Sequence, residues 1–179
     1  MNPRAALRDA TAGAHHRVDA AFSRFDLADR DGYRRFLLAQ AAGFLPTERA
    51  LDEADAEQAV PDWRERRRGD LLLADLADLA VTAPEPFGPP PIVSGKASML
   101  GAIYVLEGSR LGGALLKRAV PDTFPRRFLE ARQAAGSWRK LLKSIDDFLV
   151  RPNDLDAAVD MAARVFARFE GGANAQLGE

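Results

Sequence analysis

Apolar and small residues recur with a helical period along most of the chain. Alternating strand patterns are hard to find, and alanine, leucine, arginine and aspartate dominate while β-branched residues are few. The longest helical pattern covers residues 94–120. Six shorter patterns predict helices or helical pieces at residues 3–22, 33–44, 47–56, 64–81, 137–149 and 155–169. The chain is therefore expected to be all-α, a single-domain bundle of helices.

Proline and glycine mark where these helices should end. Asp29 to Gly32 forms a turn and cap signal, and Pro46 is expected to kink or end the second helix. Five prolines make residues 82–92 a stiff loop, and Pro121 ends the longest pattern. From Gly171 the sequence is polar and rich in glycine. We therefore expect one domain over residues 1–170 and a flexible tail over residues 171–179.

The longest helix carries an unusual number of glycines. Each glycine inside a helix costs about 1 kcal/mol relative to alanine, so the helix needs a compensating reason to keep them. Gly101, Gly108 and Gly112 are seven and four residues apart, which places them on one face, where the backbone can be approached closely. Either a neighbouring helix or a flat ligand would fit there. Close helix packing is the more common explanation, because small residues serve it in many folds.

Composition excludes several classes of protein. Because the chain has no cysteine, it has no disulfide framework and no thiolate metal site. The formal net charge of -1 gives no global attraction to nucleic acid or to an anionic membrane. The run Arg66–Arg68 is interpreted as a solvated helix face. The first residues lack the apolar core of a signal peptide, so a cytoplasmic location is expected.

The two histidines are adjacent, and only one shares a face with apolar neighbours. His15 lies on the face of Thr11, Val18 and Phe22, whereas His16 points about 100° away. A histidine on an apolar face is more often a satisfied core residue than a ligand. However, zinc or non-haem iron would need several ligands, built here largely from carboxylates, whereas haem iron requires as little as one imidazole.

Other kinds of chemistry find little support in the sequence. Neither Ser98 nor Ser109 has recognisable histidine and carboxylate partners, and the spacing of a phosphate-binding loop is missing. Three cations are more suggestive. Arg8 lies two helical turns before His15, about 10 Å along the axis, and Arg139 and Lys143 form an i, i+4 pair. Such groups could hold carboxylates on the edge of a flat ligand, although each alone would be an ordinary surface charge.

Two segments together resemble a known family. Residues 7–19 read LRDATAGAHHRVD and residues 101–113 read GAIYVLEGSRLGG, and the likeness continues in register from about residue 4 to about residue 170. The chain resembles the bacterial haem oxygenases, especially those associated with bacteriophytochromes. The resemblance implies that His15 is the proximal ligand of haem iron and that the helix through Gly108 and Gly112 crosses the distal face. The other residues it assigns to haem are Arg8, Arg139 and Lys143 for the propionates, and Thr11, Tyr104 and Phe166 in the pocket.

The resemblance also implies a reaction. Haem, as substrate and cofactor, would be opened at a meso carbon to biliverdin, carbon monoxide and ferrous iron, using O₂ and electrons from a ferredoxin or flavoprotein reductase. The distal segment of Gly108, Ser109 and Gly112 would direct the attack and anchor a chain of waters. Many family members carry an aspartate where this chain has Ser109, which can hold a water but brings no charge.

Two other functions stay open at this point. One is a non-catalytic haem carrier or sensor on the same fold, and the other is a helical interaction protein whose glycines serve packing alone. The sequence leaves undecided which meso carbon is attacked, which donor supplies electrons, and whether the purpose is iron release or bilin supply to a bacteriophytochrome.

Overall fold

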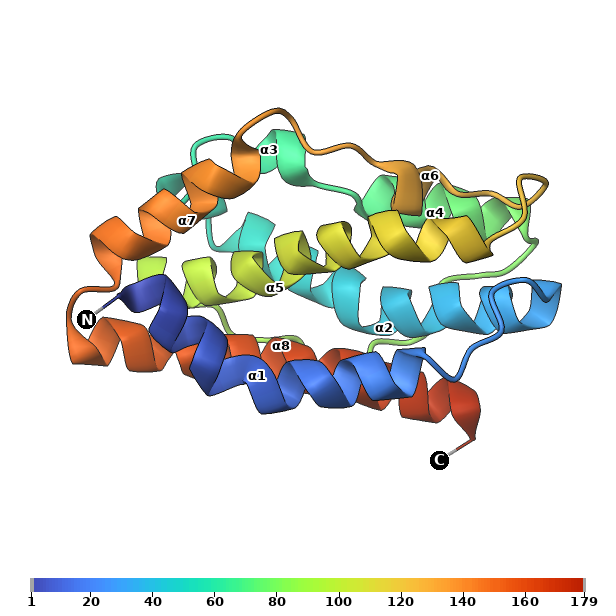
Figure 1. The fold of residues 1–179 in the computed structure, drawn as a ribbon, viewed down its shortest axis with the longest axis horizontal. Helices are drawn as coiled ribbons and strands as arrows, with labels where there is room; N and C mark the ends of the chain where they lie inside the picture. Colours follow the sequence, from blue (N-terminus) through green and yellow to red (C-terminus); the bar gives the residue numbers. More distant parts are fainter. Residues whose placement is uncertain (1, 179) are drawn as a thin grey trace.

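The computed structural model describes residues 2–178, which form helices and connecting loops without a strand (Figure 1). Met1 and Glu179, which belong to the expected domain and tail, lie outside the described residues. The expectation of an all-α chain is confirmed. The elements are α1 Pro3–Phe22, α2 Arg30–Glu53, η1 Ala56–Gln58, α3 Trp63–Arg66, α4 Gly69–Asp78, α5 Gly95–Leu116, η2 Lys117–Ala119, α6 Arg127–Glu130, α7 Ser137–Phe148 and α8 Pro152–Leu177.

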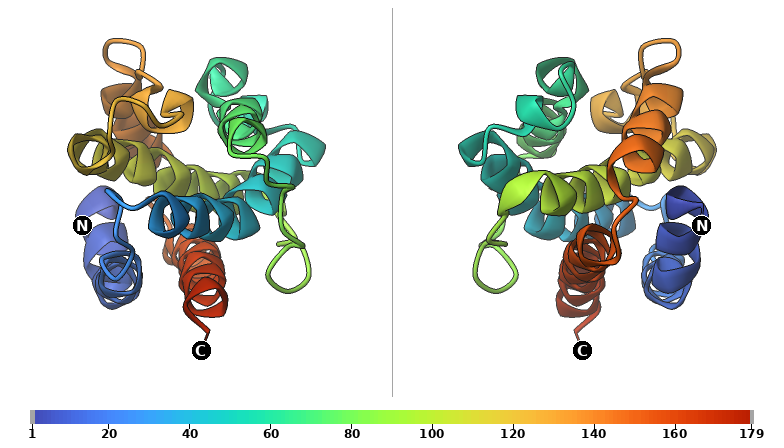
Figure 2. Two further views of the ribbon diagram at one scale, coloured as in Figure 1. Left: turned by 90° about the vertical axis from the view of Figure 1, so that its right-hand side faces the viewer. Right: turned by 90° about the vertical axis from the view of Figure 1, so that its left-hand side faces the viewer.

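Helix α8 is the element against which three other long helices pack. It contacts α1, α2 and α5 along its length (Figures 1 and 2). Its buried face is apolar because alanine, valine and phenylalanine recur at helical spacing: Ala158, Ala162, Val165, Phe166, Phe169 and Ala173. Helices α6 and α7 lie on the other side of α5 from α8 in the end-on views (Figure 2). No helix within residues 2–178 has the length and apolarity required to cross a bilayer.

Helix α1 has the bounds that the sequence pattern predicts, whereas α2 does not. The side chain of Asn2 caps α1 by accepting the amide of Ala5, and Pro3 occupies the first turn. The prediction that Pro46 kinks or ends the second helix is wrong about its end, because α2 continues to Glu53. Proline removes the amide that would bond the carbonyl of Ala42, and that carbonyl instead accepts the amide of Phe87 at 3.4 Å. A residue from the proline-rich loop thus replaces the lost helical bond.

The prediction of one helix over residues 64–81 is wrong. The chain breaks between α3 and α4, where Arg67 has an extended backbone with φ -62° and ψ 141°. The carboxylate of Glu48 in α2 accepts the amides of Arg68 and Gly69 at 2.8 and 3.0 Å, so it caps the start of α4. A contact with α2, distant in sequence, therefore divides a segment that the local apolar pattern predicts as one helix.

The last helix extends beyond the point where the polar composition predicts a tail. Helix α8 continues through residues 171–177 and ends at Gly178, whose φ of 84° is the left-handed conformation that terminates helices. Gly172 faces α2 so closely that a Cβ placed there would lie 2.9 Å from the carbonyl oxygen of Ala39. Gly172 therefore allows this end of α8 to pack against α2, and Gly171 leaves room for the ring of Phe87, so the segment is held in place as a helix.

Candidate functional site

A cavity of about 760 Å³ lies between α1 and α5. Its volume falls in the range of small-molecule and cofactor pockets, about 300–1,000 Å³. Residues from α2, α6, α7 and α8 complete its walls. The residues proposed from sequence that line it are Arg8, Thr11, His15, Tyr104, Gly108, Ser109, Gly112 and Phe166, whereas Arg139 and Lys143 are not among its lining residues.

His15 presents its imidazole to this cavity. Its side chain is 59% exposed, with Nε2 3.6 Å from Asp19 Oδ1, and its ring centroid lies 5.6 Å from that of Phe166. The residue is therefore not a satisfied core histidine. His16 also borders the cavity, although the helical period points it about 100° away from His15. The sequence alone did not place His16 there.

Thr11 lines the cavity, but its hydroxyl is bonded within α1. Its side chain is buried, and Oγ1 donates to the carbonyl oxygen of Leu7 at 2.8 Å. This is the bond that threonine commonly makes to the preceding helical turn. The hydroxyl proton is thus used within α1, and Thr11 shapes the wall one helical turn before His15.

The three glycines that share one face of α5 divide into two groups. A Cβ on Gly101 would lie 2.2 Å from the carbonyl oxygen of Ala158, so this glycine allows α5 and α8 to pack closely. A Cβ on Gly108 or Gly112 would meet nothing within 4 Å, because both face the cavity. Of these three glycines, helix packing therefore explains Gly101 alone. The other two glycines leave a space that side chains would fill, as a flat ligand lying over the helix requires.

A cation and two stacked aromatic rings are among the groups that line the cavity. Arg8 lines the cavity, and its guanidinium bonds the carboxylate of the neighbouring Asp9 at 2.9 Å. The ring of Tyr104 stacks on Trp138 with centroids 5.9 Å apart. Burial raises the pKa of Tyr104, and the positive charge of Arg8 opposes that rise. Tyr104 is therefore a neutral hydroxyl at neutral pH, close to a positive charge.

The other two predicted cations lie on α7 away from the cavity wall. Arg139 is exposed, and Lys143 is engaged by Asp147 with Nζ and Oδ2 2.6 Å apart. Arg8 is thus the one of the three that borders the cavity. A role for Arg139 and Lys143 in holding a ligand stays a prediction, and it would require their side chains to move.

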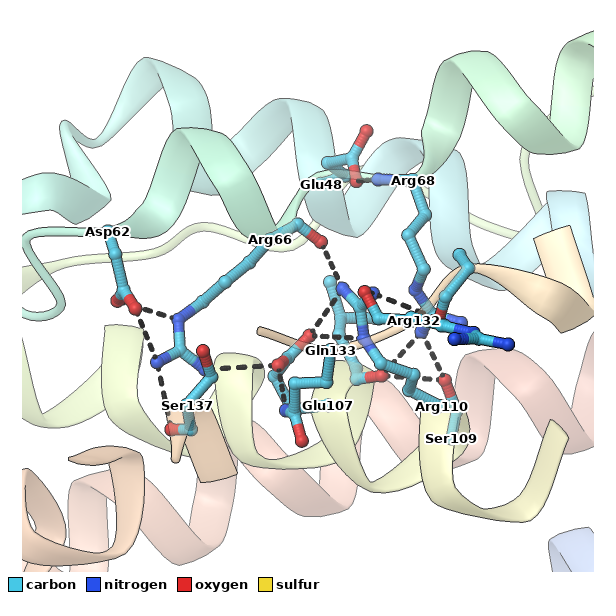
Figure 3. A network of polar contacts seen from close by, with 12 residues as sticks. Glu48, Asp62, Arg66, Arg68, Glu107, Ser109, Arg110, Arg132, Gln133 and Ser137 are labelled. Carbon is cyan, nitrogen blue, oxygen red and sulfur yellow. Dashed lines mark hydrogen bonds and ion pairs between the residues drawn. The ribbon is translucent and has the colours of Figure 1, made fainter. Parts of the chain in front are cut away.

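Behind α5 lies a buried network of charges that the sequence interpretation missed (Figure 3). The prediction that Arg66–Arg68 is a solvated face is wrong for two of the three residues. The exposed fractions of Arg66 and Arg68 are 3% and 2%, and only Arg67 is exposed. The break between α3 and α4 turns these two side chains inward, toward α5. The glycine that follows Arg68 was the one local signal of that break.

Arg68 contacts α5 from the side opposite the cavity. Its Nη2 donates to the carbonyl oxygen of Leu106 at 2.7 Å and to Ser109 Oγ at 2.9 Å. The guanidinium carbon lies 4.9 Å from the ring centroid of Phe44 and 4.7 Å from that of Phe128. Among residues 2–178 no carboxylate pairs with this guanidinium, and its Nε has no hydrogen-bond partner. Burial lowers the pKa of Arg68, as the charge of Arg110 also does.

Gln40 of α2 is a second polar group at the cavity that the sequence did not single out. It lines the cavity, and its Oε1 is buried without a hydrogen-bond partner within the described part of the chain. A buried acceptor left unpaired costs stability, so its retention is expected where a ligand or water bonds it.

Known proteins share this architecture. The crystal structure of the NO- and CO-bound heme oxygenase from Neisseria meningitidis superposes with a TM-score of 0.85, covering 99% of this chain and 93% of that one at 22% identity. Heme oxygenase from Leptospira interrogans gives a TM-score of 0.73 over 98% and 100% of the two chains at 18% identity. At these identities the likeness establishes the fold.

Sequence comparison establishes the family. The chain is 30% identical over 167 residues to Heme oxygenase PigA of Pseudomonas aeruginosa. The aligned region covers 87% of this chain and 83% of that protein. The chain is a haem oxygenase family member. A heme oxygenase of Xanthomonas campestris is 30% identical over 113 residues, or 60% of this chain and 67% of that one. A search of family models found no match.

This membership confirms the predictions of a haem oxygenase fold, of an enzyme and of haem as its cofactor. The cavity itself also has the features that a haem ligand requires. It offers an accessible imidazole on α1 and, on α5, the open space over Gly108 and Gly112 that a Cβ would enter. The association with bacteriophytochromes stays a prediction.

Proposed function

We propose that this chain binds haem in the α1–α5 cavity and opens it to biliverdin, carbon monoxide and ferrous iron, using O₂ and an external reductant. One observation carries the proposal. The exposed imidazole of His15 and the bare backbone at Gly108 and Gly112 border the same cavity, from α1 and α5. When bound, haem supplies the iron that activates O₂, and the protein supplies the geometry.

His15 is proposed as the iron ligand, and its neighbours fix its orientation. The ring of Phe166 restricts the imidazole from α8, and the carboxylate of Asp19, one helical turn further on, lies 3.6 Å from Nε2. Arg8 and Tyr104 are proposed to bind the propionates, with Arg139 and Lys143 as further candidates on α7.

On the distal side, Gly108 and Gly112 are proposed to let the α5 backbone approach haem closely. The Ser109 hydroxyl donates to Leu106 O at 2.7 Å and accepts from Arg68, which leaves one lone pair for a water. Many family members have an aspartate here. In this chain the nearby charge is positive, because Arg68 stands behind Ser109. A fixed cation in a buried site favours negative charge that develops in the cavity.

Polar groups around the cavity are sufficient to order waters. The free lone pair of Ser109 and the unpaired Oε1 of Gln40 are both acceptors at the cavity wall. Waters that bond such groups are part of the structure and can relay protons to the reacting centre. The proposed role of Gly108, Ser109 and Gly112 is thus to shape the space and anchor waters within it.

The test is a single turnover of the haem complex. Purified protein is loaded with ferric haem, and ascorbate is added in air with catalase present to remove free hydrogen peroxide. The proposal predicts decay of the Soret band and a biliverdin spectrum. Persistent haem without bilin would instead identify a haem carrier or sensor, and a failure to bind haem would favour an interaction protein. Replacing ascorbate with a ferredoxin or flavoprotein reductase then tests the class of electron donor.

A further inference from the structure

Glu107 is the centre of a buried cluster on the far side of α5 from the cavity. Glu107 is 1% exposed. Its two oxygens accept from Arg66 Nη1 at 3.0 Å, from Arg110 Nη2 at 3.0 Å and from Gln133 Nε2 (Figure 3). We call these four residues the Glu107 cluster. Glu107 directly precedes Gly108, so the cluster fixes α5 at the start of its cavity-facing glycines.

The cluster holds the segment 131–137, which joins α6 to α7. Arg110 Nη1 donates to the carbonyl oxygens of Ala131 and Arg132 at 3.3 and 3.4 Å, and Arg66 Nη2 donates to that of Ser137 at 2.9 Å. The segment reads ARQAAGS and has no large apolar side chain to bury. Its position therefore depends on these polar contacts more than on hydrophobic packing.

Helix α7 begins at the end of this segment. Its second residue, Trp138, lines the cavity and stacks on Tyr104, and the same helix carries Arg139 and Lys143. The Glu107 cluster thus joins the wall formed by α5 to the wall formed by α7. A shift of the segment would move Trp138 relative to Tyr104, within the cavity lining to which Arg8 also belongs.

We infer that Glu107 is a positioning residue that places α7 and thereby determines the orientation in which haem is seated. The inference rests on the proposed function. The physical reason is that Glu107 is the carboxylate partner of two buried guanidinium groups. Arg66 also pairs with Asp62, whereas Arg110 pairs with no other carboxylate among the described residues, so loss of the Glu107 charge leaves Arg110 uncompensated and the structure responds where it is least packed. Here that place is the segment 131–137.

Three variants separate this role from a general effect on stability. Glu107→Gln keeps the shape of the side chain and removes its charge. Gln133→Ala removes the direct bond between Glu107 and the segment and leaves both arginines paired, so it tests the role even if Glu107→Gln does not fold. Asp62→Asn is the matched control, because Asp62 also pairs with Arg66, at 2.8 Å, but makes no bond to the segment.

The first readout needs no haem. Amide hydrogen exchange of α7 in the haem-free protein should accelerate roughly tenfold in Glu107→Gln, by less in Gln133→Ala and by no more than about twofold in Asp62→Asn. Exchange in α1 should remain at the parental rate. Equal acceleration across all helices in Glu107→Gln, or unchanged α7 exchange in both cluster variants, would overturn the positioning role.

The second readout is the seating of haem, measured by proton NMR of the ferric complex from the ratio of its two rotational isomers. We expect this ratio to change by about threefold in the cluster variants and to stay parental in Asp62→Asn. An unchanged ratio in variants that bind haem would refute the inference. A parent that seats haem but yields no biliverdin would refute the proposed enzymatic function alone, because seating needs no turnover.

Discussion

The glycines of α5 give the sharpest prediction, because the structure assigns opposite roles to residues that share one helix face. In Gly101→Ala the new Cβ would lie 2.2 Å from the oxygen and 2.9 Å from the carbon of the Ala158 carbonyl. Both atoms are backbone, so α5 and α8 must separate. Overpacking costs about 1–3 kcal/mol, and a contact with backbone atoms belongs at the upper end of that range, above the roughly 1 kcal/mol that alanine gains in helix propensity.

Gly108→Ala and Gly112→Ala should have the opposite effect on the haem-free protein. No atom lies within 4 Å of either new Cβ, so the gain in helix propensity of up to about 1 kcal/mol is not offset. For a chain of this length, 1 kcal/mol corresponds to roughly 2–4 °C in Tm. We therefore expect Tm to rise by a few degrees in these two variants and to fall in Gly101→Ala.

A larger side chain at Gly112 should affect haem affinity without unfolding the protein. Gly112→Leu places a large side chain in the cavity, and we expect it to weaken haem affinity by about tenfold or more while the haem-free protein stays folded. The assays are thermal unfolding by circular dichroism and haem titration by absorbance. The reasoning is refuted if Gly101→Ala is as stable as the parent, or if Gly112→Leu binds haem with parental affinity.

Three further predictions follow from particular contacts. Arg68→Met keeps an apolar side chain between the two phenylalanine rings but removes the guanidinium that donates to Ser109 Oγ. We expect haem affinity within a few-fold of the parent and biliverdin formation slowed about tenfold or more, measured by single turnover. Arg8→Met should weaken haem affinity a few-fold in titrations, whereas Arg4→Met, which changes an exposed residue outside the cavity lining, should not. Burial raises the pKa of Asp75, so the native state binds its proton more readily than the unfolded chain and the parent loses stability as pH rises from about 4 toward the folded pKa. In urea unfolding, Asp75→Asn should therefore gain stability relative to the parent as pH rises through that window, and a difference that is constant with pH would contradict it.

The sequence pattern was sufficient where a local period decides the structure. The apolar spacing of residues 3–22 predicts α1 and the face that carries His15, and the length of the α5 pattern predicts the helix with its glycines. The pattern could not show that Gly101 and Gly108 have different roles. Both share a face, and the difference is that α8 covers one end of that face while the other end borders the cavity.

Long-range partners account for the errors. The carboxylate of Glu48, twenty residues upstream of Arg68, caps α4 and thereby divides a segment that reads as one helix. That break turns two arginines inward, which a count of charges cannot reveal. Similarly, α2 continues through Pro46 because an amide of the proline-rich loop satisfies the carbonyl that the proline leaves free.

The identity of the iron ligand tests the central claim most directly, because His15 and His16 both border the cavity. The measurement is the iron–histidine stretching band in the resonance Raman spectrum of the ferrous haem complex. The account predicts that the band is present in the parent and in His16→Ala, absent in His15→Ala, and restored there by added imidazole. A band that persists in His15→Ala, or disappears in His16→Ala, would contradict it.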